Sequence, residues 1–142
     1  LPEARNFDIG FFNLYPEDTE LSQALKGLNF FLSSNKFIKR KGVVVLMTAA
    51  SEGRGYHSLQ GETGARLYKN WGDSVIFRAV LRKMRFGLFS PNLNKFDVHH
   101  YYPKKTVFKK KFEEMIKAME KIYGSSPKAC IIPCSNQMPK SS

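Results

Sequence analysis

The feature that most constrains the fold is a nearly continuous apolar and β-branched run at residues 42–49, with the sequence Gly-Val-Val-Val-Leu-Met-Thr-Ala. Such a run, without alternation of polar and apolar side chains, is typical of a strand that is covered on both faces in a parallel sheet. Its wholly apolar part, Val43 to Met47, is far too short to cross a bilayer. We therefore expect a parallel α/β sheet and no membrane span.

Other segments alternate between strand and helix patterns along the chain. Short apolar runs predict three more strands, at residues 7–12, 86–90 and 129–132. Helical spacing of apolar residues predicts helices in the stretches 19–32 and 108–123. We also expect helices at residues 62–68 and at residues 73–82, where apolar side chains surround most of the axis. Strands that alternate with helices imply right-handed crossovers. The sequence thus predicts a three-layer, Rossmann-like α/β fold, with a mostly parallel sheet and helices on both faces.

The chain length of 142 residues fits one domain. We expect a single α/β domain at residues 1–134, in which residues 93–103 are irregular, followed by a polar tail at residues 135–142. The first eight residues have no signal-peptide pattern, which favours a cytoplasmic location. Cys130 and Cys134 match neither a redox motif nor a zinc motif, and we interpret them as buried thiols in a reducing compartment.

The chain is strongly basic, with 23 Lys and Arg residues against 12 Asp and Glu residues and a net charge of +11. An excess of this size favours anionic partners. Most of the cations lie in three clusters, at residues 36–41, 82–85 and 104–111. No nucleic-acid-binding motif accompanies these clusters, so the preferred interpretation is a set of solvated faces, and a nucleic-acid partner is not expected.

The predicted sheet indicates where a ligand would bind, because ligands of open parallel sheets lie beyond the carboxyl ends of the strands. Residues 13–26, 50–57 and 90–102 each follow a predicted strand. On the helix expected in the first stretch, Ser22, Gln23 and Lys26 share one flank beside the apolar stripe. An amide and an ammonium three residues apart suit a carboxylate ligand. Spacing alone, however, favours ordinary exposed helix residues.

The stretch 51–57 contains two glycines that allow close approach to the backbone. A structural turn is the preferred interpretation, because a dinucleotide fingerprint requires a third glycine where Ser58 stands. The alternative is that Arg54 or His57 lines a cleft. No cluster of His, Cys, Asp or Glu has metal-ligand spacing, and no nucleophile motif is present, so we assign neither a metal ligand nor a catalytic residue to this chain.

The order of several motifs resembles the C-terminal domain of nickel-dependent lactate racemases and their relatives. The motifs are Phe-Asp-Ile-Gly from Phe7, Tyr-Pro-Glu-Asp from Tyr15, Gln-Ala-Leu-Lys-Gly from Gln23, Ser-Glu-Gly-Arg-Gly from Ser51 and Cys-Ile-Ile-Pro from Cys130. The resemblance covers most of the chain. It implies a two-domain α/β enzyme that binds its substrate between the domains and inverts a 2-hydroxy acid by hydride transfer.

The same resemblance implies a cofactor, a nickel-pincer pyridinium nucleotide attached to a lysine of the N-terminal domain. The nickel-binding and catalytic histidines of the family belong to that domain too, and their motifs do not occur here. The isolated chain is therefore expected to be inactive, with the N-terminal catalytic domain and a small carboxylate as its partners. The family's Gln-x-x-Lys pair, which holds the substrate carboxylate, falls on Gln23 and Lys26.

Ser22 departs from the family pattern, because the lactate enzymes have an aromatic hydroxyl before the glutamine. A serine is too short to fill the same space, and a different, bulkier substrate follows as a hypothesis. The competing interpretation of the chain is a non-catalytic module whose basic surface binds an anionic partner.

Overall fold

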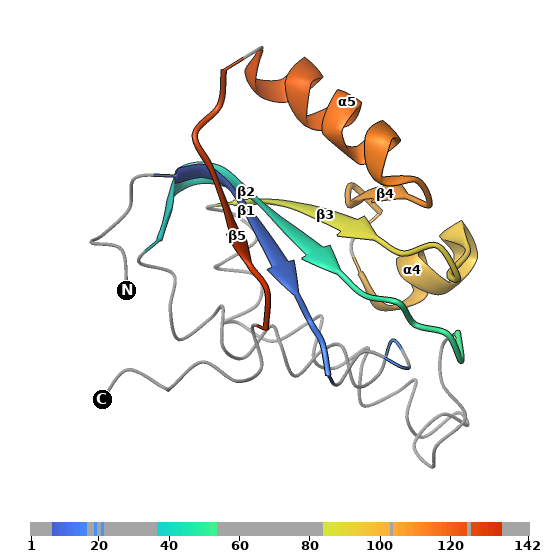
Figure 1. Ribbon diagram of the computed structural model, residues 1–142. Coiled ribbons are helices and arrows are strands. Elements are labelled where there is room, and N and C mark those ends of the chain that lie inside the picture. Colours follow the sequence, from blue (N-terminus) through green and yellow to red (C-terminus); the bar gives the residue numbers. More distant parts are fainter. Residues whose placement is uncertain are drawn as a thin grey trace.

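The computed structural model describes residues 7–16, 19, 21, 37–53, 84–102, 104–124 and 126–134, except for the side chains of residues 100 and 101. Five parallel strands form one sheet in the order β4-β3-β2-β1-β5 (Figure 1). The described elements are, in chain order, β1 (Phe7–Asn13), β2 (Ile38–Met47), β3 (Arg85–Phe89), α4 (Lys95–Tyr101), β4 (Val107–Lys109), α5 (Phe112–Tyr123) and β5 (Ala129–Ile132). The predicted α/β class with a parallel sheet is confirmed. The helices expected at residues 62–68 and 73–82 and the tail at residues 135–142 lie outside the described residues.

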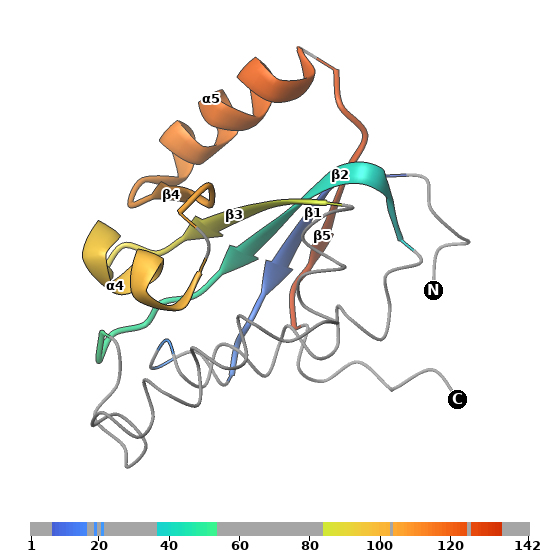
Figure 2. The same ribbon diagram turned by 180° about the vertical axis from the view of Figure 1, so that it is seen from behind.

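Apolar side chains cover both faces of the sheet, as the run at residues 42–49 predicts. Successive strand residues point to opposite faces. Phe11 and Val45 therefore pack under α5, whereas Phe12 and Leu46 belong to a second cluster on the other face, which includes Val98 of α4. Both views place α5 on one side of the sheet and α4 on the other (Figures 1 and 2). The molecule thus has three layers around its central strands.

β2 begins four residues earlier than the apolar run indicates, and it contains a bulge. Phe7 pairs with Ile38 but Ile9 pairs with Val43, so β2 has extra residues at this point. The bulge exposes Lys39, Arg40 and Lys41, and Lys41 adopts a positive φ of 72°. The apolar pattern did not predict the beginning of the strand, because three exposed cations stand there.

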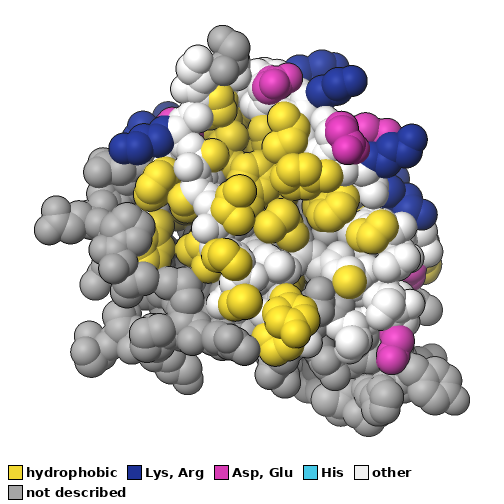
Figure 3. Space-filling model, viewed as in Figure 1, with side chains coloured by type: hydrophobic (Ala, Val, Ile, Leu, Met, Phe, Trp, Pro, Cys, Tyr) yellow, Lys and Arg dark blue, Asp and Glu magenta, His cyan; other side chains and the backbone are white. Residues whose placement is uncertain are grey.

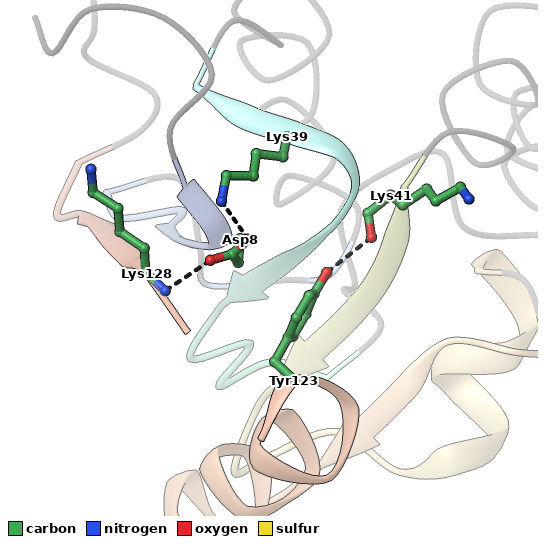
Figure 4. A network of polar contacts seen from close by, with 5 residues as sticks. All are labelled: Asp8, Lys39, Lys41, Tyr123 and Lys128. Carbon is green, nitrogen blue, oxygen red and sulfur yellow. Dashed lines mark hydrogen bonds and ion pairs between the residues drawn. The ribbon is translucent and has the colours of Figure 1, made fainter. Parts of the chain in front are cut away.

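Polar contacts hold this bulge at the amino edge of the sheet (Figure 4). The carboxylate of Asp8 accepts hydrogen bonds from Lys39 Nζ and from the backbone N–H of Lys128, both at 2.9 Å. The hydroxyl of Tyr123, at the end of α5, donates to the Lys41 carbonyl at 2.9 Å. β1, β2, β5 and α5 are therefore tied together at the amino edge.

Residues 93–103 are not irregular as expected, because they contain α4. The side chain of Asn94 caps this helix by accepting from the backbone N–H of Asp97 at 2.9 Å. Val98 is fully buried and anchors the helix in the core. A helix of only 7 residues has too few turns to show an apolar stripe, so the capping pair was its one sequence signal.

The helix predicted from Phe108 begins instead at Phe112 and ends, as predicted, before Gly124. Phe108 lies in β4, a strand of 3 residues that the sequence prediction omitted. Val107 and Lys109 flank it and pair in parallel with β3. A strand this short carries no recognisable period, and its phenylalanine happened to continue the spacing of the helix that follows.

The two cysteines are not buried as expected. Cys130 and Cys134 are free and only partly buried, because β5 is an edge strand that pairs with β1 alone among the described strands. No helix in the described part of the chain has the length and apolar character that a membrane span requires.

Candidate functional site

The carboxyl ends of the strands lie level along one edge of the sheet. Backbone hydrogen bonds continue the ladder past the strand ends: the N–H of Leu14 donates to Met47 at 3.0 Å, that of Thr48 to Phe89 at 3.1 Å and that of Ser90 to Lys109 at 3.2 Å. The strand order reverses between β1 and β5, which makes their shared edge the topological switch point. Ligands of open α/β sheets bind at this kind of place.

The loop after β2 has a tight and partly left-handed backbone. The N–H of Gly53 donates to the Ala50 carbonyl at 2.9 Å and closes a turn. Gly53 has a φ of 66°, which glycine adopts freely. Ala50 has a φ of 42° and is fully buried. This conformation costs a residue with a Cβ about 1–2 kcal/mol, so the surroundings of Ala50 must hold it in place.

Two side chains from the neighbouring β3 loop contact the peptide that precedes Ala50. The Ser90 hydroxyl donates to the Ala49 carbonyl at 3.1 Å, and Asn92 Nδ2 donates to the same oxygen at 2.8 Å. Ser90 also accepts from the backbone N–H of Asn92 at 3.4 Å. Ser90 is fully buried, whereas Asn92 is exposed. Two side chains of the loop after β3 therefore fix the orientation of the Ala49 carbonyl.

The same β2 loop holds the beginning of the first predicted helix. The N–H of Glu52 donates to the Thr19 carbonyl at 2.9 Å, and the N–H of Leu21 donates to the Gly53 carbonyl at 3.0 Å. Leu21 is helical and fully buried in the core cluster. The helix start predicted near residue 19 thus lies at the carboxyl edge of the sheet.

The sequence-predicted site residues Ser22, Gln23 and Lys26 lie outside the described residues, as do Arg54 and His57. The structure describes Leu21, which directly precedes Ser22. It also describes Gly53, which directly precedes Arg54. These two residues are hydrogen-bonded to each other. The backbone therefore brings the two predicted stretches, 13–26 and 50–57, together at one edge.

Ser90 and Asn92 were not identified individually from the sequence, although the stretch 90–102 was. The available signal was a serine and an asparagine directly after a strand, separated by a proline. Such residues often serve only to shape turns. Their contact with a strained loop on another strand depends on tertiary structure, which a local pattern does not reveal.

Large apolar side chains are exposed near the switch point. Tyr15, after β1, is 55% exposed, and Ile131, in β5, is 66% exposed. Figure 3 shows hydrophobic side chains gathered in the middle of this side of the molecule, with charged side chains mainly toward its rim. Exposed apolar surface of this kind is typical of a binding or interface region.

Shifted pKa values, in contrast, mark residues away from this edge. Hydrogen bonds from Lys39 and from the Lys128 backbone lower the pKa of Asp8. Burial raises the pKa of Tyr123 and that of the Cys130 thiol. Asp8 and Tyr123 belong to the contacts that hold the amino edge, so their shifts reflect structural interactions.

The described residues provide no ligand set for a metal ion, since they contain no group of three or more His, Cys, Asp or Glu side chains that could hold one. The chemical groups that the described part of the carboxyl edge offers are backbone amides and carbonyls, hydroxyls, asparagine amides, the exposed Glu52 and the lysines that follow β4. We therefore assign no step of a reaction to a metal or cofactor held by these residues.

Comparison with known proteins finds a similar solved structure but no matching family model or curated sequence. Among solved structures, the chain is similar to the lactate racemase apoprotein from Thermoanaerobacterium thermosaccharolyticum, with a TM-score of 0.67 and 17% sequence identity. The match covers 96% of this chain and 36% of that chain, so this chain spans about a third of its length. Almost the whole of this chain therefore shares its fold with part of a lactate racemase apoprotein.

Proposed function

We propose that this chain is the substrate-binding domain of a lactate racemase-like racemase or epimerase that acts on a 2-hydroxy acid. The observation that carries the proposal is the fold match over 96% of the chain. Two further observations support it. The Gln-x-x-Lys spacing of Gln23 and Lys26 resembles the carboxylate-binding pair of the family, and Leu21 anchors the beginning of their predicted helix at the carboxyl edge.

In this proposal Gln23 and Lys26 bind and orient the substrate carboxylate. The glutamine amide donates a hydrogen bond, and the lysine ammonium adds a charge-assisted hydrogen bond. Holding the carboxylate fixes the position of the substrate C2 atom relative to the groups that react with it. Ser22 leaves more room beside the carboxylate than an aromatic residue would, which favours 2-hydroxy acids bulkier than lactate.

A companion domain supplies the reaction chemistry in this proposal. A nickel-pincer pyridinium nucleotide like that of the resembled family would supply hydride-transfer chemistry there. The metal-ligating residues would belong to the companion domain. The exposed Tyr15 and Ile131 give this chain apolar surface near the switch point where such a domain would contact it.

The test is a racemisation assay on the protein that joins this chain to its companion domain, matured with the cofactor. Chiral chromatography would follow interconversion of the enantiomers of lactate and of longer 2-hydroxy acids. We expect Gln23→Ala and Lys26→Ala each to raise KM about ten-fold or more, because a hydrogen bond to a charged group contributes about 1.5–3 kcal/mol. Lys36→Ala, which removes the same charge ten residues later in the sequence, should leave KM unchanged.

Two outcomes would contradict the proposal. One is that the wild-type protein interconverts none of these acids. The other is that both substitutions leave KM at the wild-type value. If Lys26→Ala and Lys36→Ala instead weakened salt-sensitive binding of a polyanion to an equal extent, the chain would be a basic binding module.

A further inference from the structure

The loop after β2 connects two features that are distant in sequence. On one side, Ser90 and Asn92 of the β3 loop donate to the Ala49 carbonyl. On the other side, Glu52 and Gly53 are hydrogen-bonded to Thr19 and Leu21. Ala49 to Gly53 therefore form a bridge between the end of β3 and the beginning of the predicted substrate-binding helix.

The carbonyl of Ala49 controls this bridge because it belongs to the peptide that joins Ala49 to Ala50. Its orientation determines the φ angle of Ala50, which is 42°. A buried alanine does not prefer this angle. Without the hydrogen bonds from Ser90 and Asn92, the peptide would therefore turn to a conformation of lower free energy. A turn of the peptide would move the Glu52 N–H and the Gly53 carbonyl, which contact the helix start.

We propose that Ser90 and Asn92 are positioning residues, which hold the beginning of the substrate-binding helix at the carboxyl edge by fixing the Ala49 carbonyl. This inference rests on the proposed function for the identity of the ligand, but its geometry does not. Neither side chain needs to touch the substrate. Their effect on substrate binding passes through Ala50 and the two backbone hydrogen bonds to Thr19 and Leu21.

The primary test measures amide hydrogen exchange by NMR on the full chain. We expect Asn92→Ala and Ser90→Ala to accelerate exchange at the N–H groups of Glu52 and Leu21 about five-fold or more, as for the loss of one hydrogen bond. Exchange in α5 and β5 should stay at the wild-type rate. Asn94→Ala is the matched control, because Asn94 caps α4 and has no contact with Ala49 among the hydrogen bonds of the described residues.

A second variant separates positioning from general destabilisation. Glycine adopts a positive φ without the steric cost of a Cβ atom. Ala50→Gly should therefore restore slow exchange at Glu52 and Leu21 in the Asn92→Ala background. A merely structural weakening of the core would not be corrected by removing another buried methyl group.

Kinetics on the cofactor-loaded, two-domain protein complete the test. We expect Asn92→Ala to raise KM about five-fold and to change kcat less than about two-fold, with recovery on adding Ala50→Gly. Unchanged exchange at Glu52 and Leu21 would overturn the inference, whatever the activity. Faster exchange together with an unchanged KM would overturn the link to substrate binding. Absence of racemisation by the wild-type protein contradicts the proposed function and leaves the exchange result to decide the positioning role.

Discussion

At the scale of single residues, Asp8 shows how the amino edge of the sheet is stabilised by charge. Its carboxylate accepts from Lys39 and from the Lys128 backbone, and these hydrogen bonds lower its pKa from the usual 3.8. A carboxyl group with a lower pKa in the folded state stabilises the protein above the unfolded-state pKa. That stabilisation is lost as the pH falls through the lower, folded-state value.

Asp8→Asn should consequently lower the free energy of unfolding near neutral pH by about 1 kcal/mol, a small value because the ion pair is partly exposed. The difference from wild type should shrink below about pH 4, where the wild-type carboxyl group becomes protonated. Urea unfolding between pH 2 and pH 7 would measure both effects.

The partner of Asp8 provides the control. Lys39→Met should raise the pKa of Asp8 toward 3.8 in an NMR titration. Arg40→Met, which removes the same charge from the same bulge, should change it less. A stability difference between wild type and Asp8→Asn that does not vary with pH would show that the carboxylate charge contributes nothing.

At the scale of elements, predictability depended on length and on burial. β2 was predicted correctly over most of its span, because Val43 to Leu46 are buried on both faces and must therefore be apolar. The three-residue strand β4 and the seven-residue helix α4 were missed. Both are too short for a periodic pattern. They are held by contacts distant in sequence, namely the pairing of β4 with β3 and the burial of Val98.

The cap of α4 can be tested directly. Asn94→Ala should lower the free energy of unfolding by about 1 kcal/mol, because the Asp97 N–H loses the acceptor that Asn94 Oδ1 provides. Asn94→Ser retains a capping oxygen and should restore most of this loss. Chemical denaturation followed by far-UV circular dichroism would compare the variants. Equal stability of Asn94→Ala and wild type would show that burial of Val98 alone maintains the helix.

At the scale of the whole molecule, the sequence predicted the class of fold, which the structure confirms, and a ligand site at the carboxyl edge, which stays a prediction. Both follow from the alternation of strands and helices, which a single sequence displays. The partners within the candidate site did not follow. The bridge from Ser90 and Asn92 through Ala49 to Leu21 joins segments about 30 to 70 residues apart. No local pattern encodes which residues of these loops are hydrogen-bonded to one another.

The two hydrophobic clusters share one sheet, and this predicts cooperative unfolding. Ile9 belongs to the cluster under α5 and Ile38 to the cluster on the opposite face, and both are almost fully buried. Ile9→Val and Ile38→Val should each cost about 1 kcal/mol. The double variant should lose the sum to within about 0.5 kcal/mol, because the two side chains belong to different clusters.

Urea unfolding would measure these losses, with methyl NMR signals of Met115 and Leu88 reporting on the two faces. Their midpoints should coincide in the wild type and in all three variants, because β1 and β2 contribute side chains to both clusters. Separate midpoints would mean that one face loses its packing while the other remains folded. The strands that form the carboxyl edge are covered by both clusters. In that case the edge would not be a single rigid support for a ligand site.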